Sequence, residues 1–228
     1  MIGNIINADF FASVIRIATP LALAGLGGVF SEKSGVINIG LEGMMLTGAF
    51  AAVSATNFFS NPWLGIIVAV IVGMLLGLIH AIVSVSFKAN QIVSGVAINL
   101  FASGITVFLS WLWFNETQIM AEKNLPIWGF AVPKAEESIP LIRNLIVIFA
   151  HHSPMIFIAF IIIVLSHLII FKTPFGLRLR SVGEYPHAAD TLGVNVINMR
   201  YIAVMISGAL AGLAGSFLSI EQAHFFVK

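Results

Sequence analysis

Four polar side chains stand among glycines between two apolar runs near the start of the chain. The segment Gly27 to Gly43 reads GGVFSEKSGVINIGLEG and contains Glu32, Lys33, Asn38 and Glu42, although only 9% of all residues are charged. A charge at bilayer depth costs about 2.5 kcal/mol or more, so such groups normally face a protein interior, a water-filled cavity or the membrane surface. Glycines allow irregular backbone, which is tolerated at this depth only where protein or a cavity satisfies it. The segment therefore indicates either a broken or re-entrant element beside a pathway or an ordinary turn between two helices.

Three further polar side chains, His80, Gln91 and Asn99, lie within or beside apolar runs. Polar groups inside a low-dielectric bundle could hydrogen-bond a polar solute, or they could hold helices together. For Asn99 and His80 the structural alternative is a hydrogen bond within the bundle, and for Glu42 it is an ion pair with Lys33. The candidate pathway residues are Asn38, Glu42, His80, Gln91 and Asn99.

The composition is that of an integral membrane protein. Of the 228 residues, 59% are hydrophobic, and the mean hydropathy is +1.02. Several apolar runs are long enough to cross about 30 Å of hydrocarbon as helices, and the ten-residue alternation of a barrel is absent. We therefore expect an all-α, polytopic transmembrane helix bundle that forms a single domain over residues 1–228. The predicted spans are residues 11–30, 43–59, 63–87, 92–114, 153–171 and 201–220.

The charge distribution predicts which loops face the cytoplasm. Basic residues outnumber acidic ones in residues 172–200, whereas residues 115–152 are slightly acidic. Because loops rich in Lys and Arg stay in the cytoplasm, we expect 172–200 to be a cytoplasmic loop and 115–152 an extracytoplasmic loop. Alternation then places Glu32 and Lys33 inside and the N-terminus outside, unless one segment is re-entrant.

Several classes of chemistry find no support in the sequence. A net charge of +1 without a basic stripe argues against nucleic-acid binding, and the lack of cysteine removes disulfides and thiolate ligands. His151 and His152 point in different directions if helical, and no further ligand is evident, so we expect no metal site. No HExxH, GxSxG or GxxxxGK[ST] pattern occurs. We therefore expect neither an enzyme nor a bound cofactor.

The loop over residues 172–200 contains a predicted short helix. Pro186 suits the first turn of a helix and Gly193 suits the residue just past its end, so the helix should cover Tyr185 to Leu192. A helix of about two turns is marginal alone in water and needs a surface to pack on. The alternative is a basic loop that rests on anionic lipid headgroups.

Small residues recur near the end of the chain. Gly208, Gly212 and Gly215 lie on one helix face at four- and three-residue spacing. This spacing lets two transmembrane backbones approach closely. The partner is either another helix of this chain or a second subunit.

Three segments together resemble the permease subunits of bacterial ABC importers. They are FSEKSGVINIGLEGMMLTGAF (residues 30–50), NQIVSGVAINL (residues 90–100) and RSVGEYPHAADTLGVNV (residues 180–196). The resemblance is to the branched-chain amino acid and simple-sugar permease superfamily and is nearest to its nucleoside-type members. It implies a multi-pass plasma (inner) membrane subunit that moves nucleosides or related simple sugars.

The resemblance also implies partners. ATP would be hydrolysed by separate cytoplasmic ATP-binding subunits, and the complex would include a second permease subunit and an extracytoplasmic substrate-binding protein. The pathway amides and carboxylate would then bind ribose hydroxyls or base edges. The residues expected to couple the permease to its ATPase are Arg178, Arg180, Glu184, Ala188, Ala189 and Gly193.

Two other functions remain open at this point. An ion- or proton-coupled secondary transporter would rely on Glu42 or His80 as its titrating group. A non-transporting membrane scaffold or remnant is the second alternative, because permeases of this kind continue beyond a segment like SGALAGLAGSFLSIEQAHFFVK. On that comparison we expect the chain to be truncated at its C-terminus.

Overall fold

The computed structural model describes residues 8–116, 118–123, 125 and 152–227. Most of the predicted loop 115–152, including His151, lies outside the described residues. The helices are α1 (Ala8–Lys33), α2 (Leu41–Phe59), α3 (Pro62–Ala81), α4 (Gln91–Phe114), α6 (Pro154–Lys172), α7 (Pro174–Glu184), α8 (Pro186–Thr191) and α9 (Val196–Ser216), and the strands are β1 (Gln118–Met120) and β2 (Phe225–Val227). Two π-helical segments, Ile82–Ser86 and Phe217–Ala223, extend α3 and α9. The predicted all-α bundle is confirmed.

Short polar side chains fix where several helices begin. Asn61 accepts a hydrogen bond from the backbone nitrogen of Trp63 at 3.0 Å, with Pro62 in the first turn of α3. Asn90 does the same for Ile92 at 2.9 Å at the start of α4. These caps satisfy backbone N–H groups that have no partner inside the helix. The apolar runs therefore start as helices at defined residues.

Five helices of the described chain are long and apolar enough to cross a membrane. They correspond to five of the six predicted spans, and the sixth, residues 43–59, is α2, which is not among the five. Its sequence is rich in Gly, Ala, Ser and Thr, and most of its residues are buried. Small residues let α3, α4 and α9 pack around α2, so it occupies the centre of the bundle and has little contact with lipid.

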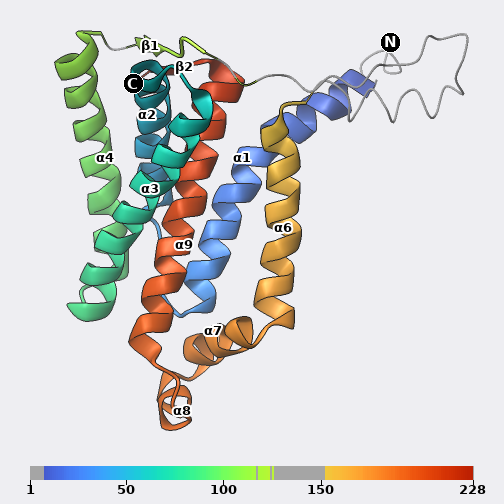
Figure 1. Cartoon of the computed structure of the whole chain (residues 1–228). Coiled ribbons are helices and arrows are strands. Elements are labelled where there is room, and N and C mark those ends of the chain that lie inside the picture. Colours follow the sequence, from blue (N-terminus) through green and yellow to red (C-terminus); the bar gives the residue numbers. More distant parts are fainter. Residues whose placement is uncertain (1–7, 117, 124, 126–151, 228) are drawn as a thin grey trace, which may run out of the picture.

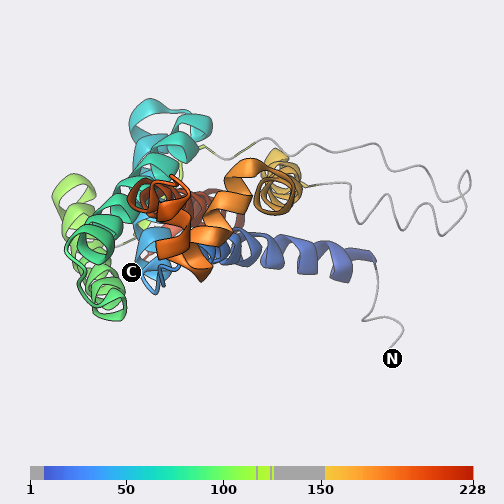
Figure 2. The same ribbon diagram turned by 90° about the horizontal axis from the view of Figure 1, so that it is seen from below.

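The bundle is arranged around α2, α3 and α9, with α4 on one flank and α1 and α6 on the other (Figure 1 and Figure 2). The connections 34–40 and 87–90 and the helices α7 and α8 lie at one end. At the other end β1 pairs antiparallel with β2, with Ile119 opposite Phe226. Segments 172–200 and 34–40 thus lie at the same end of the bundle. This arrangement is the one expected if the six predicted spans run in alternating directions across the membrane.

Glycines bring α9 against two neighbouring helices. A Cβ built on Gly208 would collide with the carbonyl oxygen of Gly73, and one on Gly73 would lie 2.8 Å from the Cα of Gly212. On the α2 side, a Cβ on Gly48 would lie 2.6 Å from the Cα of Gly212, and one on Gly215 would collide with the backbone of Met45. The sequence left the partner of this face open. In the structure, α3 and α2 of the same chain occupy it.

Candidate substrate pathway

The seven residues between α1 and α2 form turns at 34–35 and 39–40, with three non-helical residues between them, and run into the bundle. Arg200 Nε, near the start of α9, donates to the carbonyl oxygen of Ser34 at 3.2 Å. At the other end of the segment, Asn38 Nδ2 donates to Ser207 Oγ at 3.0 Å. Ser207 lies eleven residues beyond Val196, the first residue of α9, so Asn38 sits about 16 Å inside the bundle. The backbone is therefore non-helical at bilayer depth. The chain then continues as α2 toward the opposite end of the bundle, so this segment is not a re-entrant loop that returns to the end it came from.

Burial alternates along this segment, as it does in a strand with one protein-facing side. Ser34, Val36 and Asn38 are buried, whereas Ile37 and Ile39 are exposed. The exposed fractions of Ile37 and Ile39 are 47% and 42%. Residues 34–40 therefore have one side packed on α9 and one side open.

Three of the predicted pathway residues bond the backbone of this segment. Gln91 Oε1 accepts from the nitrogen of Ile37 at 2.8 Å, and His80 Nε2 lies 3.1 Å from the oxygen of Ile37. Asn99 Oδ1 accepts from the nitrogen of Gly43 at 2.8 Å, and its Nδ2 donates to the oxygen of Ile39 at 3.2 Å. Unsatisfied backbone groups cost several kcal/mol in the hydrocarbon region, so these side chains stabilise the break in the helix.

Asn38 and His80 complete this network from inside the bundle. Asn38 Oδ1 accepts a hydrogen bond from the backbone nitrogen of Gly40 at 3.1 Å, which satisfies that N–H group just before α2 begins. His80 is fully buried, and its Nδ1 lies 2.9 Å from Ser94 Oγ. Both ring nitrogens of His80 are therefore engaged with protein. The structure brings Asn38, His80, Gln91 and Asn99 together, and each holds backbone or a neighbouring side chain.

Glu42 is the predicted pathway residue that stands apart. It lies exposed in the first turn of α2, one turn after Asn38, and borders an open cavity of about 590 Å³. Both Glu42 and Lys33 are described, and no ion pair joins them within the described chain. A carboxylate exposed at this depth must face water or another protein. The lining comprises Glu42, Met45, Leu46, Ala49, Leu218, Ser219, Ala223, Phe225, Phe226 and Val227.

The segment after α6 forms two helices where the sequence predicted one. The predicted helix 185–192 is α8, and the preceding α7 was missed because its arginines make it read as a loop. Phe175, Leu179 and Val182 recur at helical spacing, and Leu179 and Val182 are fully buried. That spacing was the signal for α7.

The predicted coupling residues divide between surface and interior. Arg178, Glu184, Ala188 and Gly193 are exposed. Arg180 is half-buried, with its guanidinium carbon 5.4 Å from the centre of the Phe171 ring. Ala189, however, is only 2% exposed and packs in the cluster that contains Leu179, Val182 and Met199, so it cannot touch a partner in this arrangement.

Two exposed apolar side chains next to α8 were not singled out from the sequence. Leu192 is 84% exposed and Tyr185 is 64% exposed, so they project further than the small alanines. Apolar groups at the polar end of a membrane protein are typical of protein contacts. They extend the candidate contact surface at this end to both sides of α8.

α7 abuts the start of segment 34–40. A Cβ built on Gly183 would collide with the carbonyl oxygen of Lys33 and lie 3.2 Å from the nitrogen of Gly35. Gly35 adopts φ +81°, which L side chains rarely take. Helix α7 therefore makes direct backbone contact with the segment that leads to Asn38 and Glu42.

The sequence matches one known protein family over nearly its whole length. The family described as branched-chain amino acid transport system / permease component matches residues 10–227. The chain belongs to this permease family. With its apolar helices, the permease is a multi-pass plasma membrane protein.

Three relatives illustrate what the permease resembles. It is 47% identical over 217 residues to the guanosine ABC transporter permease protein NupQ of Bacillus subtilis, covering 91% of this chain and 67% of the relative. It is 38% identical to the nucleoside ABC transporter permease protein NupC of Lactococcus lactis, covering 93% and 68%. It is 35% identical to the putative glucose ABC transporter permease protein TsgC13 of Haloferax volcanii, covering 96% and 65%. No solved structure matches the chain.

Proposed function

We propose that this permease is the membrane-spanning subunit of an ABC importer that translocates nucleosides or related simple sugars. The observation that carries the proposal is the 47% identity to a guanosine permease over 91% of the chain. The 38% identity to a nucleoside permease supports the same substrate class. The subunit itself performs transport and no catalysis.

Energy comes from separate ATP-binding subunits that dock on α7 and α8. The chain has no phosphate-binding loop of its own. The docking surface consists of Arg178, Glu184 and Ala188 together with the exposed Tyr185 and Leu192. Segment 172–200 is cytoplasmic in this proposal, and 115–152 is extracytoplasmic and faces a substrate-binding protein.

The substrate path runs along the cavity bordered by Glu42. A second permease subunit covers the open face of α2, because an exposed carboxylate at bilayer depth needs water or protein beside it. Glu42 accepts hydrogen bonds from hydroxyl or amine groups of the substrate. Asn38, His80, Gln91 and Asn99 shape the wall by holding segment 34–40 in place.

The energy source of uptake tests this proposal against ion- or proton-coupled transport. We expect uptake of labelled guanosine by cells with the intact complex to stop when the partner ATPase is inactivated. Uptake should persist when the proton gradient is collapsed and ATP is maintained. Uptake that follows the proton gradient at constant ATP would overturn the proposal, and no uptake of any solute would favour a scaffold.

Replacing Asn99 with alanine separates a structural role from substrate contact. The change leaves the N–H of Gly43 and the C=O of Ile39 without a partner at a cost of about 1–3 kcal/mol each, so the unfolding temperature should fall by about 4–24 °C. Maximal uptake should fall, while the guanosine concentration for half-maximal uptake stays unchanged.

The matched control is Thr106→Val on the same helix, because Thr106 Oγ1 bonds only within α4, to the oxygens of Ala102 and Ser103. This variant should change neither quantity. If Asn99→Ala instead raises the half-maximal concentration at unchanged thermal stability, Asn99 contacts substrate directly.

A further inference from the structure

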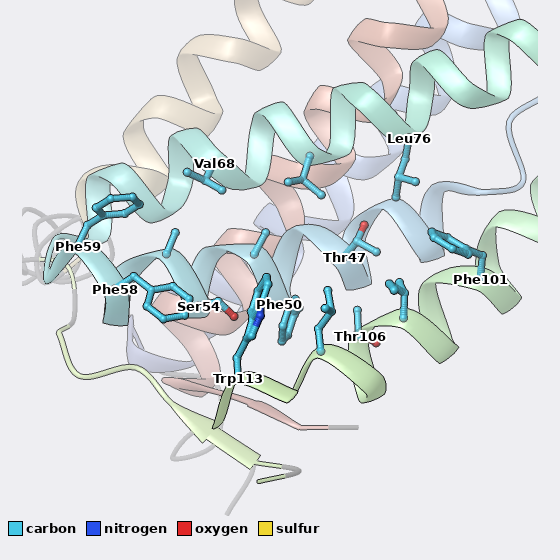
Figure 3. Close-up of a pocket in the computed structure, with 15 residues that line it drawn as sticks. Thr47, Phe50, Ser54, Phe58, Phe59, Val68, Leu76, Phe101, Thr106 and Trp113 are labelled. Atoms are coloured by element: carbon cyan, nitrogen blue, oxygen red, sulfur yellow. The ribbon is translucent and has the colours of Figure 1, made fainter. Parts of the chain in front are cut away.

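A narrow slot lies between α3 and α4, with α2 as its floor (Figure 3). The two helices meet near connection 87–90 and separate toward the other end of the bundle (Figure 1). The slot has a volume of about 360 Å³. Its lining includes Ala51 and Ser54 on α2, Val72 on α3, and Ile105 and Trp113 on α4.

The slot opens sideways toward hydrocarbon. Beside it on α3, Ile67 and Ile71 are 53% and 46% exposed, and on α4 Phe108 and Leu112 are 59% and 62% exposed. Exposed apolar side chains on a transmembrane helix face lipid. A lipid chain can therefore enter the slot laterally.

The dimensions of the slot fit a single hydrocarbon chain and not a helix. Its border on α4 runs from Phe101 to Trp113, which at 1.5 Å per residue is about 18 Å. A volume of 360 Å³ over that length leaves about 5 Å of width for the centres of water-sized groups, or about 8 Å from wall to wall, whereas a helix with its side chains is about 10–12 Å across. A transmembrane helix of a partner is too wide to enter.

One polar group in the slot has no partner. Ser54 is 3% exposed, and its Oγ makes no hydrogen bond with any described residue. Its neighbours behave differently, since Thr47 and Thr56 donate to carbonyl oxygens of their own helix at 2.9 and 2.7 Å. Because an unpaired buried hydroxyl is costly, Ser54 is suited to a ligand that carries an acceptor oxygen, which its Oγ, covered by neighbouring atoms, reaches when the side chain rotates about χ1.

The position of Ser54 also gives the ligand an orientation. Figure 3 shows Ser54 near the end of the slot that holds Phe58 and Trp113, while Leu76 and Phe101 mark the other end. Aromatic residues gather where hydrocarbon meets the polar headgroups. The acceptor oxygen therefore lies toward the membrane surface and the apolar part lies deeper.

We propose that the slot binds one acyl chain of a membrane glycerolipid, whose ester carbonyl accepts a hydrogen bond from Ser54. The chain runs past Val72 and Ile105 toward Leu76. A nucleoside does not suit this slot, because its ribose hydroxyls would find almost no partners there. The site is thus separate from the proposed substrate path, and the proposal stands whether or not the transported solute is a nucleoside.

Photo-crosslinking of the purified protein in vesicles tests the site. The vesicles contain phosphatidylethanolamine and phosphatidylglycerol with a trace of phosphatidylcholine that carries a diazirine on its acyl chain. After irradiation, mass spectrometry should find label on Ala51 and Ala55, which are 9% and 5% exposed, as well as on Leu112 at the lipid face.

Filling the slot should remove only the inner label. Ala51→Phe should abolish labelling of Ala55 and leave Leu112 labelled, whereas Gly104→Phe, at a position with open space around it, should change neither. Ser54→Ala keeps the slot open and should weaken retention of phospholipid in native mass spectrometry by roughly two- to tenfold. Label confined to Leu112 in the unaltered protein, or inner label that survives Ala51→Phe, would overturn the proposal.

Discussion

Replacing Gly183 with valine is expected to reduce uptake by about tenfold while the ATPase still docks. Any side chain at this position meets the carbonyl oxygen of Lys33, so α7 must move away from the end of α1 and from Gly35. The exposed surface of α8 is untouched by this change. ATP hydrolysis by the assembled complex should therefore continue without productive transport, as measured by uptake and phosphate release in the same vesicles.

Ser181→Val is the matched control for Gly183→Val. Ser181 lies two residues earlier on α7, is half-buried, and its hydroxyl bonds only within α7, to the oxygen of Arg178. Normal uptake in this control shows that valine in α7 is tolerated. Equal uptake by Gly183→Val and the unaltered protein would show that the contact with Lys33 and Gly35 transmits no motion.

Gly208→Leu is expected to deplete folded protein from the membrane. The leucine side chain has no space against Gly73 and Gly77, because the backbones of α9 and α3 are in direct contact there. The helices must separate, which removes packing along the centre of the bundle and costs about 3 kcal/mol or more. Folded protein can be measured by size-exclusion chromatography of detergent extracts.

Gly104→Leu provides the comparison for Gly208→Leu. Gly104 is also a glycine within a transmembrane helix, but nothing lies within 4 Å of a Cβ built there. Leucine favours helix over glycine by about 0.8 kcal/mol, so this variant should be at least as stable as the unaltered protein. Equal recovery of both variants would contradict close packing between α3 and α9.

The large elements of the fold could be predicted because each follows from local sequence. Length and apolarity predicted six spans, and five of them are long apolar helices in the described chain. The position of α2 at the centre of the bundle was harder to predict from sequence. Small residues indicate close helix packing but do not identify the helices that pack on them. α7 was missed because Arg178 and Arg180 made its sequence resemble a polar loop, although the apolar residues of its buried face recur at helical spacing.

Sequence reasoning singled out the polar residues of the candidate site but not their geometry, and their role in binding substrate stays a prediction. Asn38, His80 and Asn99 were recognised as unusual because polar groups are costly at bilayer depth. Their partners lie far away in sequence, as with Asn38 and Ser207, which are 169 residues apart. No local pattern reports such pairings. Ser54 escaped notice for the same reason, because a serine in a helix is unremarkable until its surroundings are known.

Competition for guanosine uptake tests the central claim most directly. The permease is reconstituted in vesicles with its ATP-binding subunits and binding protein, and ATP-driven uptake of labelled guanosine is measured with unlabelled competitors. Excess adenosine should suppress uptake of the label, while tyrosine, the substrate named for one relative, should leave it unchanged. Absence of ATP-driven guanosine uptake, or uptake that tyrosine suppresses and adenosine does not, would contradict the account.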